Sequence, residues 1–144
     1  MSLTAIKGLY RETATYINQE IKVGGWVRTV RVSKGVGFIE INDGSFFKNL
    51  QVVFNNNLPN FLEVEKLSIG SSIEVRGRLI ESPAAGQSFE LSAQEVIIIN
   101  QAAADYPLQK KGHSFEFLRE IAHLRSRGNT FSAIFRLRSV LSYA

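Results

Sequence analysis

Residues 21–54 read IKVGGWVRTVRVSKGVGFIEINDGSFFKNLQVVF, and they contain three segments with the alternating polarity of half-buried strands. In residues 21–32 the apolar side chains first occupy odd positions, as at Val27, and then even positions, as at Val30. A change of phase within one strand predicts a β-bulge or a sharp bend, which small barrels use to curl a strand around two faces.

The next two segments separate apolar from polar side chains. Residues 37–42 carry two isoleucines on one face and Phe38 on the other, and residues 50–54 turn Gln51 away from their apolar side. The exposed face predicted from this pattern carries Trp26, Arg28, Phe38 and Gln51. Unpaired nucleic acid is bound by such groups, because rings stack on bases, cations attract phosphates and amides pair with base edges.

Each of these residues also has a structural interpretation. Trp26 lies in a strand that bends, where a large ring often packs into the core against a terminal helix. Phe38 could instead contact a loop or a neighbouring domain, and a surface glutamine such as Gln51 is usually only solvated. The combination of the three side chains favours the nucleic-acid interpretation.

The composition suits one domain with a single core. The chain has 144 residues, 44% of them hydrophobic, and a net charge of +4 that only mildly favours an acidic partner. Cysteine is absent, which excludes disulfides and zinc sites built from thiolates. We found no membrane-length apolar run and no signal-peptide pattern, so the sequence predicts a cytoplasmic protein with no membrane partner.

The remaining segments complete a barrel. Residues 2–20 predict a short helix with Thr4 as its N-cap, and residues 59–67 predict a helix after the third strand. Two further alternating strands follow at residues 72–81 and 88–100. Five strands with a helix between the third and the fourth predict a mainly β protein, the Greek-key barrel called the OB-fold, whose second and third strands commonly bind oligonucleotides.

Outward-facing charged residues add further candidates for this surface. Arg31 joins Arg28 on the first strand, and the fourth strand turns Arg76 and Arg78 outward. These four arginines are candidates for guiding phosphates. On the fifth strand Glu90 is predicted to face outward, where it could accept hydrogen bonds from the amino or imino group of a base.

The composition changes after residue 100. Residues 101–128 predict a linker, within which Ser114 could cap a short helix. Residues 129–144 predict a helix whose apolar surface is too broad for a small barrel to bury. We therefore expect this helix to need a second subunit or another domain, and the chain to be part of a longer protein.

No catalytic or metal site is predicted. His113 and His123 lie in or beside the linker without cysteine or paired carboxylate neighbours, so structural or surface roles are favoured. Gly35 and Gly37 suit a hairpin turn better than a phosphate-binding loop, since no Lys-Ser or Lys-Thr pair follows them.

Three segments carry a resemblance to a known family. They are VGGWVRTVRVSKGVGFIEINDGS (23–45), LQVVF (50–54) and HSFEFLREIAHLRSRGNTFSAIFRLRSVLSYA (113–144). Together they resemble the N-terminal part of bacterial asparaginyl-tRNA synthetases, which are class IIb aminoacyl-tRNA synthetases. The resemblance implies an anticodon-binding OB-fold over residues 1–100, a linker over 101–128 and the start of the class II catalytic domain at 129–144.

The resemblance also implies roles for single residues. Phe38 would stack on the central uridine of the anticodon, Gln51 would read that base, Arg28 would contact the backbone or a base, and Glu90 would meet a neighbouring base. The partners implied are the anticodon stem-loop of tRNA(Asn), the protein's own catalytic domain and a second subunit in a homodimer. The full-length enzyme would use ATP and magnesium to join asparagine to tRNA(Asn), whereas this chain would hold no cofactor and no active site.

Three other functions stay open on the sequence alone. The chain could belong to an aspartyl- or lysyl-type relative in the same class. It could be a stand-alone OB-fold that binds single-stranded nucleic acid without regard to base identity. It could also be a barrel that binds another protein, with no nucleic-acid partner.

Overall fold

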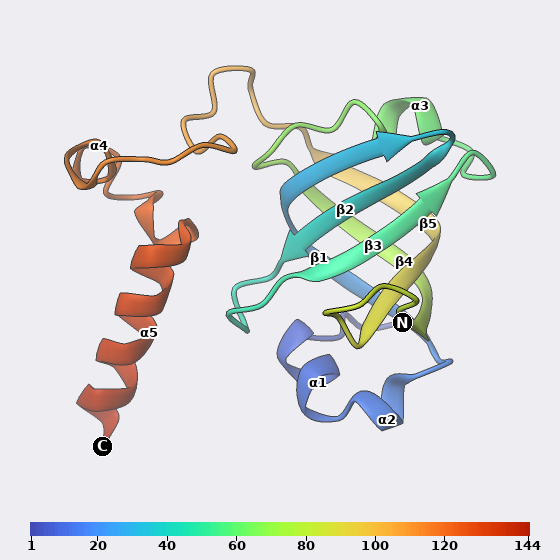
Figure 1. Ribbon diagram of the computed structural model, residues 1–144, viewed down its shortest axis with the longest axis horizontal. Coiled ribbons are helices and arrows are strands. Elements are labelled where there is room, and N and C mark those ends of the chain that lie inside the picture. The colour runs from blue at the N-terminus through green and yellow to red at the C-terminus, as the bar shows by residue number, and fades with distance from the viewer. The chain divides into compact units, whose positions relative to one another are not determined.

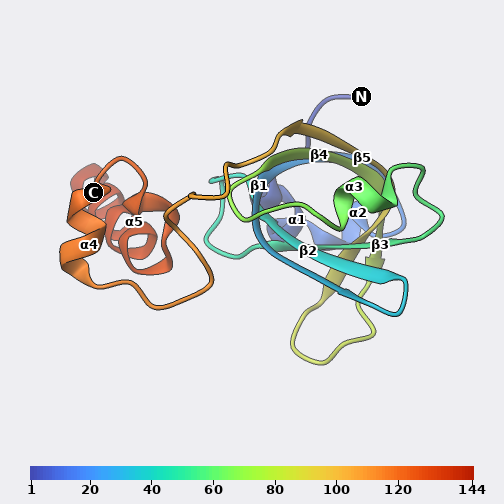
Figure 2. The same ribbon diagram turned by 90° about the horizontal axis from the view of Figure 1, so that it is seen from above.

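The computed structural model describes all 144 residues, which form two compact units, Met1–Tyr106 and Pro107–Ala144. In the first unit five strands close into a barrel in the order β1-β2-β3-β5-β4, shown from the side in Figure 1 and from the α3 end in Figure 2. The fold predicted from the sequence, a mainly β OB-fold with a helix between the third and fourth strands, is confirmed.

The barrel contains both antiparallel and parallel strand pairs. Its strands are β1 (Glu20–Ser33), β2 (Val36–Asn42), β3 (Leu50–Asn55), β4 (Ser72–Glu81) and β5 (Phe89–Asn100). The long β1 pairs antiparallel with both β2 and β4, and β5 pairs parallel with β3 and antiparallel with β4. Closure leaves no free edge among the five strands.

The phase change inside β1 is a β-bulge. Pairing with β2 shifts register between Val27 and Thr29, so Arg28 is the extra residue. Because of this insertion, Val27 and Val30 both pair with isoleucines of β2 that point into the barrel. The bulge predicted from the sequence is therefore confirmed.

Helices cover both ends of the barrel. α1 (Ile6–Arg11) and α2 (Thr13–Tyr16) lie at one end, and α3 (Phe61–Val64) lies at the other (Figure 1). Ile6 and Leu9 of α1 are fully buried in the core. The fully buried side chains from the strands include Val23, Ile39, Ile41, Leu50, Val52, Val75, Leu79 and Leu91.

The start of α1 differs from the prediction. Thr4 does not cap the helix; instead the backbone N–H of Ile6 donates to Asp43 Oδ2 at 2.8 Å and that of Lys7 donates to Ser45 Oγ at 3.0 Å. The caps come from the loop between β2 and β3, far away in sequence, so no local pattern could reveal them. The helical segment also breaks at Glu12 into two short helices rather than one.

The first unit continues past the predicted boundary at residue 100. Ser68 Oγ donates to the backbone oxygen of Ala102 at 3.0 Å, and the backbone N–H of Ala102 donates to Ser71 Oγ at 3.0 Å. The ring of Tyr106 covers Gly70 so closely that a Cβ atom there would lie 2.6 Å from it. These contacts tie residues 101–106 to the segment that leads into β4.

The second unit is helical. It contains α4 (Phe115–Glu120), the 3-10 turn η1 (Arg125–Arg127) and α5 (Asn129–Tyr143). Ser114 caps α4 as predicted, since its hydroxyl accepts from the N–H of Phe117 at 3.2 Å. The guanidinium of Arg125 lies over two phenylalanine rings of α5, 4.8 and 5.4 Å from their centroids.

α5 has no buried residue. Its large apolar side chains Ile134, Leu137, Val140 and Leu141 are exposed by 41%, 61%, 66% and 66%. Broad apolar exposure of this kind is uncommon on a helix that has no partner. No helix in the structure has the length and apolar character needed to cross a membrane.

Candidate nucleic-acid interface

The pairing of β1, β2 and β3 brings Arg31, Phe38 and Gln51 to one outer face of the barrel. Arg31 on β1 lies opposite Phe38 on β2, and Phe38 lies opposite Val53 on β3. Two residues further along the same strands, Glu40 of β2 lies opposite Gln51 of β3. These side chains share the outer surface of neighbouring strands, which run side by side across the barrel in Figure 1.

Phe38 lies half-buried on this outer surface. Ile39, its neighbour in sequence, is 0% exposed and points into the core, so the parity of β2 turns the Phe38 ring outward as predicted. The guanidinium carbon of Arg31 lies 5.9 Å from the centroid of the ring. A ring with a cation beside it offers both a stacking surface and an attraction for phosphate.

Gln51 lies on the same surface, diagonal to Phe38. Leu50 and Val52 on either side of it are fully buried, which fixes its outward direction. Diagonal neighbours across strands are about 7 to 8 Å apart, within reach of one base that touches both. Gln51 Nε2 donates a hydrogen bond to Glu90 Oε2 at 3.2 Å.

Glu90 differs from its prediction as an exposed acceptor. It is only 6% exposed, because the loop between β4 and β5 folds back over it. Ser82 Oγ at the start of this loop and Gln87 Nε2 near its end both donate to Glu90 Oε2 at 3.2 Å. Alternation along β5 predicted the outward direction of the side chain but could not reveal the loop that covers it.

Trp26 and Arg28 lie further along β1. Trp26 is 39% exposed and pairs with Asn42 of β2, so the interpretation of Trp26 as a core residue is wrong. Arg28 occupies the bulge and is half-buried. Both residues border the face that carries Phe38, on the side towards the loop between β2 and β3.

The structure does not bring Arg76 and Arg78 to this face. Both lie exposed on β4, which pairs with β1 and β5 and with neither β2 nor β3. Arg76 Nε lies 3.6 Å from Glu20 Oε1 and 3.3 Å from Glu95 Oε2. Parity along β4 predicts that these arginines point outward, but only the closed strand order shows which side of the barrel they occupy.

The loop between β2 and β3 adds residues that the sequence reasoning missed. Phe47 is 51% exposed in this loop, and the neighbouring Lys48 places its Nζ 5.7 Å from the ring centroid of Tyr10. Asn49 Nδ2 donates to Glu40 Oε2 at 3.4 Å, which connects the loop to the outer face. The only sequence signal for these residues is the pair of phenylalanines beside a lysine in GSFFKN (44–49), between the second and third predicted strands.

Tyr10 holds this loop against α1. Its hydroxyl donates to the backbone oxygen of Asn49 at 2.7 Å, and its ring packs 4.8 Å from the rings of Phe46 and Phe89. Burial raises the pKa of Tyr10 above its ordinary value of 10.0, and the negative charge of Glu40 adds to this increase. The neutral hydroxyl is therefore the form that the fold favours.

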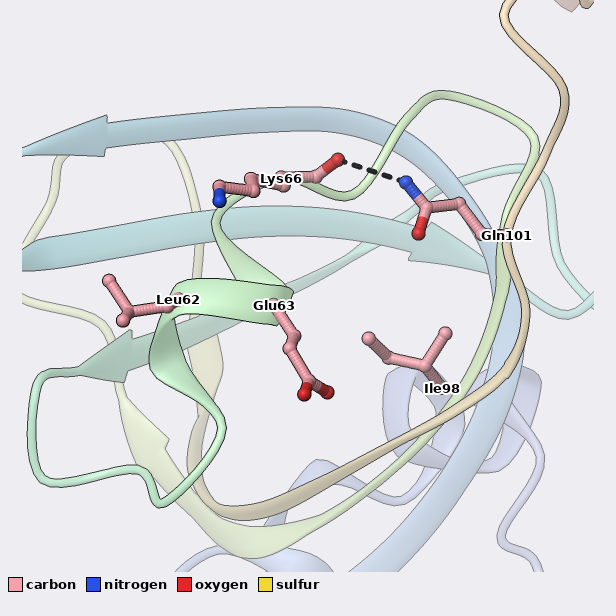
Figure 3. Close-up of a pocket in the computed structure, with 5 residues that line it drawn as sticks. All are labelled: Leu62, Glu63, Lys66, Ile98 and Gln101. Atoms are coloured by element: carbon pink, nitrogen blue, oxygen red, sulfur yellow. Dashed lines mark hydrogen bonds between the residues drawn. The ribbon is translucent and has the colours of Figure 1, made fainter.

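A separate pocket lies at the α3 end of the barrel. Figure 3 shows it lined by Leu62, Glu63, Lys66, Ile98 and Gln101, with Gln101 Nε2 donating to the backbone oxygen of Lys66 at 3.3 Å. The lining holds no aromatic ring on which a base could stack. No group of three or more histidine, cysteine or acidic side chains in the structure is arranged to hold a metal ion.

The chain is similar along its whole length to asparagine–tRNA ligases from bacteria. It is 60% identical over 144 residues to that of Desulfitobacterium hafniense strain Y51 and 62% identical over 145 residues to that of Acetivibrio thermocellus. Each alignment covers 100% of this chain but only 31% of the relative, so the chain spans about a third of the length of these proteins.

A solved structure has the same fold. The asparaginyl-tRNA synthetase from Pyrococcus horikoshii, complexed with asparaginyl-adenylate, matches 99% of this chain and 33% of its own, with a TM-score of 0.85 at 22% identity. Residues 21–99, which include the barrel strands and the face around Phe38, match the family described as the OB-fold nucleic acid binding domain. The chain belongs to the OB-fold nucleic acid binding domain family.

Proposed function

We propose that this chain is the anticodon-binding part of an asparagine–tRNA ligase and that it binds the anticodon stem-loop of tRNA(Asn). The observation that carries the proposal is that Phe38 and Gln51 are diagonal neighbours on the outer face of β2 and β3. The identity of 60% to asparagine–tRNA ligases supports it and favours this assignment over an aspartyl- or lysyl-type relative.

The face supplies each interaction that an unpaired uridine needs. Phe38 stacks on the central base, since every base has a flat aromatic surface, and Gln51 pairs with its edge through one acceptor and one donor. Arg31, beside the Phe38 ring, and Arg28, in the bulge of β1, attract the backbone phosphates. Glu90 accepts from a neighbouring base through Oε1, because its three protein donors all contact Oε2.

Aromatic groups at the border of the face extend the contact. Trp26 and Phe47 are exposed by 39% and 51%, and either ring provides a surface for a flanking nucleotide. Lys48 beside Phe47 places a cation at the same border. Arg76 and Arg78 stay a prediction of the sequence, and their position on β4 limits them to long-range attraction of the RNA.

The complete protein would attach asparagine to tRNA(Asn) in the cytoplasm, with ATP and magnesium. We assign these cofactors to the part of the longer protein that lies outside this chain, since relatives are about three times as long. Residues 101–128 would form the linker, and residues 129–144 would begin the catalytic domain. The exposed apolar side chains of α5 would then be covered by that domain or by the second subunit of a homodimer.

Binding of a labelled anticodon stem-loop tests this function. The chain is titrated with a stem-loop that carries the anticodon GUU and with a second one whose central uridine is replaced by adenosine. We expect clearly tighter binding to GUU, since Gln51 pairs with the uridine edge. Equal affinity for the two RNAs would support a binder that ignores base identity, and no binding at low salt would support a protein partner instead.

A further inference from the structure

Glu90 is a buried carboxylate on which three hydrogen bonds converge. Gln51 Nε2 from β3, Ser82 Oγ and Gln87 Nε2 each lie 3.2 Å from the same oxygen, Oε2. Glu90 is 6% exposed, so these donors replace water around the carboxylate. Ser82 is the first residue of the loop that covers Glu90 and Gln87 lies near its end, so the loop and the side chain fix each other in place.

This arrangement decides which end of the Gln51 amide faces outward. A glutamine amide has an accepting oxygen at one end and a donating nitrogen at the other, and rotation by half a turn exchanges them. A carboxylate only accepts hydrogen bonds, so the nitrogen of Gln51 must face Glu90. Oε1 of Gln51 then points away from Glu90 and makes no hydrogen bond within the protein.

We propose that Glu90, held by Ser82 and Gln87, fixes the orientation of the Gln51 amide and thereby makes the site select a base with an imino N–H over one with a bare ring nitrogen. A base stacked on Phe38 presents its edge to Gln51 at a fixed height. Uracil offers N3–H to the outward oxygen, whereas cytosine offers the lone pair of N3, which that oxygen repels. The inference rests on the proposed function, because it needs a base at this face.

The hydrogen bonds from Ser82 and Gln87 are needed to hold the carboxylate of Glu90 against Gln51. Without them the carboxylate of Glu90 could rotate away from Gln51, and the amide could then turn to suit either base. When the accepting oxygen of Gln51 meets the lone pair of cytosine N3 instead of the N3–H of uracil, the affinity for the RNA should fall by about 10- to 100-fold. Glu90 and Gln87 are therefore positioning residues for the selection of the base, in addition to any contact that they make with RNA.

The test compares three stem-loops that differ only in the central anticodon base: uridine, cytidine and N3-methyluridine, which lacks the imino hydrogen. For the wild-type chain we expect affinity for uridine about 10- to 100-fold above that for the other two. In Glu90→Met, a side chain of similar length with no acceptor oxygen, nothing holds the nitrogen of Gln51, so its amide can turn and the uridine-to-cytidine ratio should fall towards one. Glu95→Met is the matched control, since it removes another carboxylate of β5, one that contacts Arg76.

The outcomes separate the two proposals. A wild-type chain that does not prefer uridine overturns both the proposed function and this inference. If the wild type prefers uridine and Glu90→Met keeps the same ratio, even with weaker binding to every RNA, only this inference is overturned. Gln87→Ala, which keeps the carboxylate but removes one loop donor, provides a second variant should Glu90→Met unfold, and it should lower the ratio partway.

Discussion

Arg31 and Phe38 stand opposite each other on β1 and β2, with the guanidinium carbon 5.9 Å from the centroid of the ring. Arg31 takes part in none of the salt bridges that join Lys22 to Glu74 and Arg76 to Glu20 and Glu95. The positive charge of Arg31 is therefore available for phosphate, whereas the charge of Arg76 on β4 is balanced by two carboxylates.

Arg31→Ala should weaken binding of the GUU stem-loop and make it less sensitive to salt. One lost phosphate contact on a single strand reduces the slope of log Kd against log salt concentration by about 0.7. The measurement is a titration at several salt concentrations. Lys66→Ala is the control, since Lys66 is an exposed cation at the α3 end. Equal slopes for wild type and Arg31→Ala would remove Arg31 from the interface.

Phe47→Ala should weaken binding of the stem-loop without changing the preference for uridine at the central position. Stacking on an exposed ring tolerates any base, so its loss affects RNAs with different central bases equally. Phe47→Tyr keeps the ring and should bind as the wild type does. If Phe47→Ala binds both RNAs with wild-type affinity, the loop between β2 and β3 takes no part in the interface.

Tyr10→Phe should lower the free energy of unfolding by about 0.5 to 1.5 kcal/mol at neutral pH, because it removes the hydrogen bond to Asn49. Thermal or urea unfolding measures the change. Tyr143→Phe is the control, since Tyr143 is 95% exposed. A Tyr10→Phe variant as stable as the wild type would show that Tyr10 does not hold the loop.

The raised pKa of Tyr10 also makes the free energy of unfolding depend on pH in the alkaline range. Its pKa is raised in the folded protein, so the folded state holds the proton more tightly than the unfolded state does. This contribution is fully present below the ordinary pKa of 10.0 and is lost as pH rises through the raised value. Tyr10→Phe, which has no proton to lose, should therefore lose stability less steeply above pH 10 than the wild type.

Gly77→Ala should destabilise the barrel, since a Cβ atom there would lie 2.1 Å from the backbone oxygen of Ser92 on β5. Overpacking of this kind typically costs about 1 to 3 kcal/mol. Gly24→Ala is the matched control, because the nearest atoms to its Cβ lie at 3.5 Å, an ordinary contact. Similar unfolding midpoints for the two variants would contradict the close approach of β4 and β5.

The alternation of polar and apolar residues along the sequence predicted the features that depend on a single strand. The alternation around Phe38 and Gln51, and the change of phase at Arg28, gave the strands, the bulge and the outward faces. Interactions between distant segments were not predictable in this way. The carboxylate of Asp43, which caps α1, lies far from that helix in the sequence, and the loop that covers Glu90 is shown only by its contacts in the folded chain. Arg76 lies on a strand that pairs with neither β2 nor β3, and the alternation of side chains along one strand does not reveal the order of strands in a barrel.

The most direct test of the interface is the affinity of Phe38→Ala for the GUU stem-loop. Loss of one stacked base should cost about 1 to 3 kcal/mol, which raises Kd roughly 5- to 150-fold, while the fold remains intact by circular dichroism. Leu62→Ala, which removes an exposed apolar side chain at the α3 end, should bind as the wild type does. Wild-type affinity in a folded Phe38→Ala variant would contradict a nucleic-acid interface on the outer face of β2 and β3.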